Sequence, residues 1–112
     1  MNTTVLVSAN DVFHRLASSK WQFCTARDAW VEFLAYLENR RGVDLGTLRG
    51  MAEIRLAFAC VEQGHHERFT VSGDPDVEWF LEFSTRPAVT EALCKFLDYR
   101  GIPSSFVLDV GQ

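Results

Sequence analysis

The sequence has no long hydrophobic run. No stretch approaches the ~18 consecutive apolar residues that a membrane-spanning helix needs. Met1 to Thr4 carry no basic residue, and Asn10 and Asp11 interrupt the apolar run that follows, so we expect no signal peptide. These absences predict a chain that does not associate with a membrane.

Cysteine is scarce and has no motif. The three cysteines, Cys24, Cys60 and Cys94, are odd in number, form no CxxC pair and lie inside apolar stretches. This pattern is typical of small core residues in a reducing compartment rather than of a disulfide framework. We therefore expect a cytoplasmic protein.

Residues that bind metals or activate nucleophiles are also few. His65, His66 and Glu67 are consecutive, and neighbouring residues of a strand point to opposite sides, so we expect no metal site there. The three glycines within 42–50 follow no predicted strand and lack the Lys-Ser/Thr of a phosphate loop. No glycine-rich elbow surrounds a serine or cysteine. The sequence thus predicts no catalytic residue, no metal and no cofactor, and a non-enzyme is favoured over an enzyme.

Basic residues are outnumbered in the second half of the chain. The net charge is −4, with six Lys/Arg against five Asp/Glu in residues 1–50 and five against ten in residues 51–112. Residues 62–82 contain six carboxylates, and Arg68 is the one Lys or Arg among them. Nucleic-acid binding is not expected without a basic patch. The acidic segment favours a basic protein partner, or it is simply a solvated face.

What the chain does contain is aromatic residues. Nine Phe and three Trp among 112 residues are enough to build the core of a single domain, which we place over residues 1–112. The segment 77–83 is the clearest pattern: Val77, Trp79, Leu81 and Phe83 alternate with other residues at period two. It predicts a strand over 77–84 with one buried face.

Three helices are predicted from apolar residues at helical spacing. The first covers residues near 10–19, and the second covers residues 26–41 with Thr25 as its N-cap. The third begins at Pro87 and ends at Gly101. Residues 51–62 are ambiguous. Their alternating apolar residues favour a strand, whereas a helix capped by Thr47 and ending near Gly64 is the alternative.

Short β-rich runs complete the expected fold. Strands are predicted over 3–8, 68–72 and 105–110, with turns at 63–66 and 73–76. The order β-α-α-β-β-β-α-β predicts an α+β two-layer sandwich, with helices on one face of a mostly antiparallel sheet. The order is similar to a ferredoxin-like pattern with an extra strand.

The second face of this predicted sheet is the candidate binding surface. We expect a protein-binding module, of inhibitor or adaptor type, that meets a basic partner or a second copy of itself in a homodimer. The predicted partner-binding residues are Glu78, Phe80, Glu82, Arg55, Asp74 and Asp76. The alternative is a small-ligand protein or enzyme whose pocket lies between helices and sheet and is lined by Trp30, Phe33 and Trp79.

Overall fold

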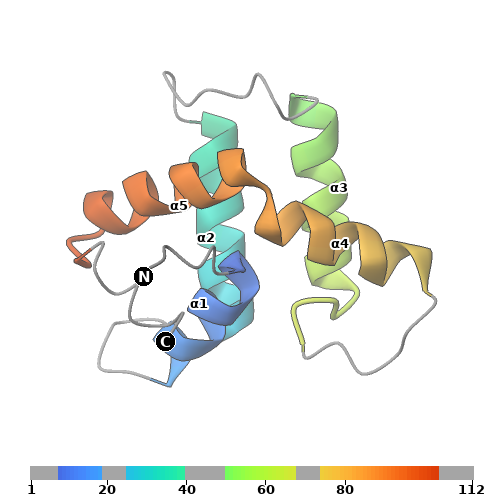
Figure 1. Ribbon diagram of the computed structural model, residues 1–112, viewed down its shortest axis with the longest axis horizontal. Helices are drawn as coiled ribbons and strands as arrows, with labels where there is room; N and C mark the ends of the chain where they lie inside the picture. The colour runs from blue at the N-terminus through green and yellow to red at the C-terminus, as the bar shows by residue number, and fades with distance from the viewer. Residues whose placement is uncertain (1–7, 19–24, 40–49, 68–73, 104–112) are drawn as a thin grey trace, which may run out of the picture.

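Helices alone form the regular structure of the residues that the computed structural model describes, which are 8–18, 25–39, 50–67 and 74–103 (Figure 1). Their bounds are α1 Ala9–Ala17, α2 Ala26–Asn39, α3 Met51–Glu62, α4 Pro75–Thr85 and α5 Pro87–Tyr99. No strand occurs in these ranges, so the predicted α+β sandwich is wrong.

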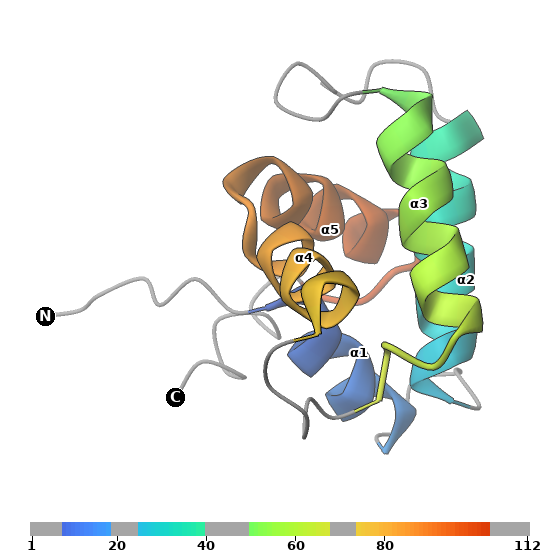
Figure 2. The same ribbon diagram turned by 90° about the vertical axis from the view of Figure 1, so that its right-hand side faces the viewer.

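The helices form two layers. α2 and α3 lie side by side and run antiparallel, and α1, α4 and α5 all lie on the same side of this pair (Figures 1 and 2). α4 crosses α3 steeply rather than lying along it, and α5 crosses α2 in the same way (Figures 1 and 2). The apolar core fills the space between the layers.

Helices α1 and α2 confirm their predictions because each has both a cap and a continuous apolar stripe. The Ser8 hydroxyl accepts a hydrogen bond from the Asn10 N–H at 3.1 Å, and the Thr25 hydroxyl accepts one from the Asp28 N–H at 3.0 Å. The predicted continuation of the second helix to residue 41 lies outside the described residues.

The ambiguous segment 51–62 is helix α3, so the favoured strand is wrong and the alternative of a helix is confirmed. Its N-cap is Gly50, and the predicted cap Thr47 lies outside the described residues. The apolar residues on its inward face are Ile54, Ala57, Cys60 and Val61, which recur at helical rather than alternating spacing. The predicted turn at 63–66 is present, but it follows the end of this helix rather than joining two strands. Gly64 has φ of 90°, and hydrogen bonds from the N–H groups of residues 64 and 65 to the carbonyls of residues 61 and 60 close a Schellman motif.

The predicted strand 77–84 is also wrong, because it lies within helix α4. The predicted turn before it is the start of the helix: the Asp74 carboxylate accepts a hydrogen bond from the Asp76 N–H at 2.9 Å, and Pro75 occupies the first turn. Phe80 and Phe83, three residues apart, are both fully buried. Helical spacing therefore decides which aromatic residues of α4 enter the core.

Helix α5 confirms the prediction of a helix from Pro87, and its N-cap is Arg86. Gly101 has φ of 75°, and the Ile102 N–H donates to the Leu97 carbonyl at 2.8 Å in a second Schellman motif. The apolar residues on its inward face are all buried: Val89, Leu93, Phe96 and Leu97.

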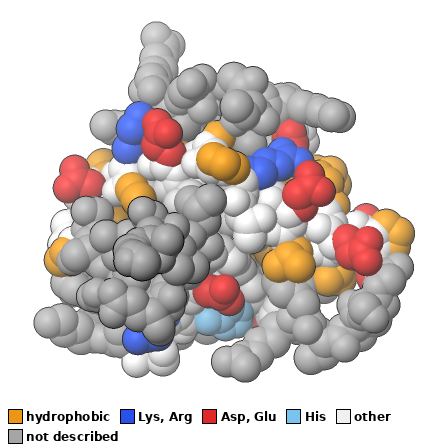
Figure 3. All heavy atoms as spheres, in the orientation of Figure 1, with side chains coloured by type: hydrophobic (Ala, Val, Ile, Leu, Met, Phe, Trp, Pro, Cys, Tyr) orange, Lys and Arg blue, Asp and Glu red, His pale blue; other side chains and the backbone are white. Residues whose placement is uncertain are grey.

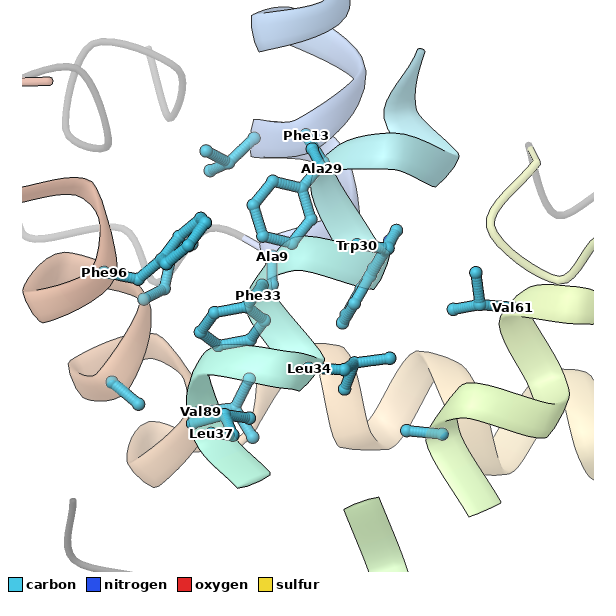
Figure 4. Close-up of a cluster of buried hydrophobic side chains, with 14 of the residues drawn as sticks. Ala9, Phe13, Ala29, Trp30, Phe33, Leu34, Leu37, Val61, Val89 and Phe96 are labelled. Carbon is cyan, nitrogen blue, oxygen red and sulfur yellow. The ribbon is translucent and has the colours of Figure 1, made fainter. Parts of the chain in front are cut away.

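Aromatic side chains from four helices meet in the core, and Figure 4 shows those of α1, α2 and α5. Trp30 of α2 is fully buried, and its ring centroid lies 4.9 Å from those of both Phe13 and Phe80. Its indole Nε1–H donates to Asn10 Oδ1 at 2.7 Å, so the one polar atom of the ring has a partner within the core. Phe33 and Phe96 extend the cluster toward α5, with centroids 5.4 Å apart.

The predicted strands 3–8, 68–72 and 105–110, and the cysteine at position 24, fall almost wholly outside the described residues. Among the residues that are described, no helix is both long and apolar enough to cross a membrane.

Candidate functional site

The outward face of α4 is acidic with an apolar centre. Glu78, Leu81 and Glu82 are exposed and share one side of the helix, because they are spaced three and four residues apart. Every charged residue within Pro75–Thr85 is a carboxylate. Figure 3 shows acidic and hydrophobic side chains next to one another on the surface of α4. We call the surface formed by Glu78, Leu81 and Glu82 the acidic face.

The predicted partner-binding residues do not all lie on this surface. Glu78 and Glu82 do, and Asp76 is exposed nearby in the first turn. Phe80 is fully buried against Trp30 and so is not part of any contact surface. It points inward because residue 80 is on the same helical side as Phe83, not on the outer side of a sheet.

The other two predicted residues have structural partners. The Asp74 carboxylate caps α4, where a negative charge also suits the helix dipole. Arg55 lies on α3, and its Nη2 is 3.4 Å from Oε2 of Glu38 on α2. No sheet brings Arg55 beside Glu78 and Glu82 in the described part of the chain.

A groove of about 340 Å³ lies where α4 crosses α3. Its lining residues are Ala52, Glu53, Leu56, Trp79, Glu82 and Arg86. Leu56 is 46% exposed, and Trp79 is half-buried with its ring stacked on Phe83 at a centroid distance of 5.3 Å and an angle of 19°. The groove therefore has apolar walls on both helices and adjoins the acidic face through Glu82.

A charge cluster forms one end of the groove. Glu53 is only 6% exposed, and its carboxylate pairs with the Arg86 guanidinium, which also lies 3.6 Å from Glu82 Oε1. The Arg86 guanidinium lies over the ring of Phe83, 5.7 Å from its centroid. Arg86 thus ties the junction of α4 and α5 to α3. The sequence pattern did not predict this pair, although Glu53 stands beside Ile54 on the inward side of the helix.

The residues of the alternative ligand pocket are not brought together. Trp30 and Phe33 are fully buried in the core, with centroids 6.0 Å apart, whereas Trp79 lines the groove. Trp30 and Phe33 are therefore closed to solvent, whereas Trp79 lines a separate groove on the surface.

His14 and His66 have a structural role. The His14 Nε2–H of α1 donates to the carbonyl of His66, and the His66 Nδ1 lies 3.1 Å from the carbonyl of Val61. His66 Nε2 is also 3.0 Å from Glu67 Oε1. These contacts join α1 to the end of α3. Within the described ranges, no group of three or more metal-binding side chains is close enough to hold an ion.

The two described cysteines are free thiols. Burial, with smaller contributions from Asp76 and Asp74, raises the pKa of Cys60 from 9.0 to about 11. Burial, and then the charge of Glu91, also raises the pKa of Cys94. Both thiols are therefore protonated at neutral pH and are poor nucleophiles.

Comparison with protein-family models, with curated proteins and with solved structures gives no match.

Proposed function

We propose that this protein is a non-enzymatic binding module whose acidic face receives a basic protein partner. The observation that carries the proposal is the exposure of Leu81, 42% accessible, between the carboxylates of Glu78 and Glu82. An exposed apolar side chain with charges of one sign at its rim suits a protein interface. Carboxylates around it attract Lys and Arg and speed association with a basic partner.

The chemistry of the remaining side chains supports binding rather than catalysis. The two thiols in the described part of the chain, Cys60 and Cys94, have raised pKa values and are therefore poor nucleophiles. Their free state is also in keeping with the reducing cytoplasm that we propose as the setting.

A random-peptide display library tests the proposal, with the immobilised protein as the target. We expect the enriched peptides to be rich in Lys and Arg. Their affinity should fall by at least about tenfold for the double variant Glu78→Lys/Glu82→Lys, because two attractive charges become repulsive. Affinity for the unaltered protein should also fall as salt rises from ~0.1 M to ~1 M, where the screening length shortens to about 3 Å.

The matched control is Glu91→Lys/Asp98→Lys, which makes the same change in net charge on exposed residues of α5. This control separates a local surface from a general charge effect. The proposal fails if the selected peptides are neutral or acidic, if none bind, or if both double variants weaken binding equally. Light scattering on the free protein detects the homodimer, for which an isologous contact between two acidic faces is unfavourable.

The groove gives a specific reason to keep the small-ligand alternative. Its volume of about 340 Å³ is near the lower end of the ~300–1,000 Å³ that ligand pockets occupy. A metabolite that binds there should raise the melting temperature of the protein and should lose this effect when Trp79 is replaced. A thermal-shift screen that finds no such compound removes the alternative.

A further inference from the structure

The groove between α3 and α4 is preformed on its aromatic side. The Trp79 ring stacks on Phe83, which is fully buried, so the indole is held in place at the groove wall. Leu56 stands on the facing helix with nearly half of its surface open to solvent. An apolar group placed between Leu56 and Trp79 would be buried without a rearrangement of the core.

The size and shape of the groove favour one side chain rather than a whole helix. The two helices cross steeply rather than lying along each other (Figures 1 and 2), and the groove is lined by three residues of α3, two of α4 and Arg86. Its volume of about 340 Å³ is small for a cofactor. It suits a single large apolar side chain together with the chain that carries it.

The charges at the groove favour a cationic neighbour for that side chain. Two carboxylates, Glu53 and Glu82, share one guanidinium, so the lining carries an excess of one negative charge. Arg86 is held by both carboxylates and by the ring of Phe83, and an anion could use it only by breaking these contacts. Glu82 is 73% exposed and therefore accessible to an incoming Lys or Arg.

We infer that the basic partner inserts one large apolar side chain between Leu56 and Trp79, with a Lys or Arg next to it that pairs with Glu82. This inference rests on the proposed function, and it names the chemistry of the contact: a short basic segment with one leucine, methionine or phenylalanine anchor. The acidic face receives the remaining positive charges, and the groove selects among basic segments.

The test uses the basic peptides selected on the immobilised protein. Leu56→Ser should weaken their binding by about tenfold or more, because the buried area of a leucine-sized contact is lost. The matched control is Val31→Ser on α2, a residue that is 40% exposed against 46% for Leu56, and it should leave the affinity unchanged. Replacing the apolar residue of the peptide by alanine should cause a similar loss for the unaltered protein and no further loss for Leu56→Ser.

Trp79 gives an independent readout. The indole Nε1–H resonance that disappears in Trp79→Phe should shift when the peptide is added, and it should shift less in Leu56→Ser. If Leu56→Ser and Val31→Ser bind equally well while Glu78→Lys/Glu82→Lys does not bind, the groove inference is overturned and the proposed function stands. If the charge reversal has no effect, the proposed function is overturned and the inference falls with it.

Discussion

Replacing Phe80 by alanine gives the sharpest test of the fold. A helix buries Phe80 and exposes Leu81, whereas the predicted strand would expose Phe80 and bury Leu81. In helix α4, Phe80 is fully buried and Leu81 is 42% exposed. In a strand over 77–84, Leu81 would point into the core with Trp79, and Phe80 would point outward. The two single substitutions therefore have opposite expected effects in the two structures.

The magnitude follows from the burial of Phe80. Truncation of a buried phenylalanine to alanine destabilises proteins by about 3–5 kcal/mol, and Phe80 also loses its contact with Trp30 at a centroid distance of 4.9 Å. We expect Phe80→Ala to lower the free energy of unfolding by about 4 kcal/mol. This is a large share of the ~5–15 kcal/mol that stabilises a typical domain. Leu81→Ala, at an exposed position, should change it by about 0.5 kcal/mol or less.

Urea unfolding followed by far-ultraviolet circular dichroism measures both variants, provided that the slope against denaturant stays the same. A loss under about 1 kcal/mol for Phe80→Ala, together with a larger loss for Leu81→Ala, would refute the burial of Phe80 and restore the strand.

Three further predictions concern single contacts of the core and the groove. Asn10→Ala removes the acceptor of the Trp30 indole N–H and should lower the free energy of unfolding by about 1–3 kcal/mol in urea unfolding; an unchanged value would mean that this hydrogen bond contributes nothing. Arg86→Met should lower the free energy of unfolding by about 3 kcal/mol, because the Glu53 carboxylate, 6% exposed, loses its ion pair. The double variant with Glu53→Met should recover most of that loss, and strictly additive effects would contradict the pairing. Cys60, whose pKa is raised from 9.0 to about 11, should react with iodoacetamide at pH 8 about 100-fold more slowly in the folded than in the urea-unfolded protein, measured by peptide mass spectrometry, and equal rates would contradict its burial.

Helices α1, α2 and α5 were predictable because a helix-start signal precedes an apolar stripe in each of them. Ser8 and Thr25 accept capping hydrogen bonds at the starts of α1 and α2, and in α5 the buried residues recur at helical spacing after Pro87. Helices α3 and α4 were predicted as strands because their apolar residues also happen to alternate. In α4 the deciding signal was present: an Asp74 cap, then Pro75 and two carboxylates in the first turn, which is typical of a helix start.

The candidate site was predictable only in part. The exposure of Glu78 and Glu82 follows from their charge, in a helix as in a strand. The Glu53–Arg86 pair could not be predicted, because it joins residues 33 positions apart through the crossing of α3 and α4. Trp79 was predicted to line a pocket, but its neighbours across the groove depend on the same crossing.

The most direct test of the binding surface is an NMR titration of the ¹⁵N-labelled protein with a selected basic peptide. We expect the largest shifts at the amides of Glu78, Leu81 and Glu82 and at the Trp79 indole, with little change along α5. Largest shifts along α5, with Glu78, Leu81 and Glu82 unmoved, would contradict this expectation.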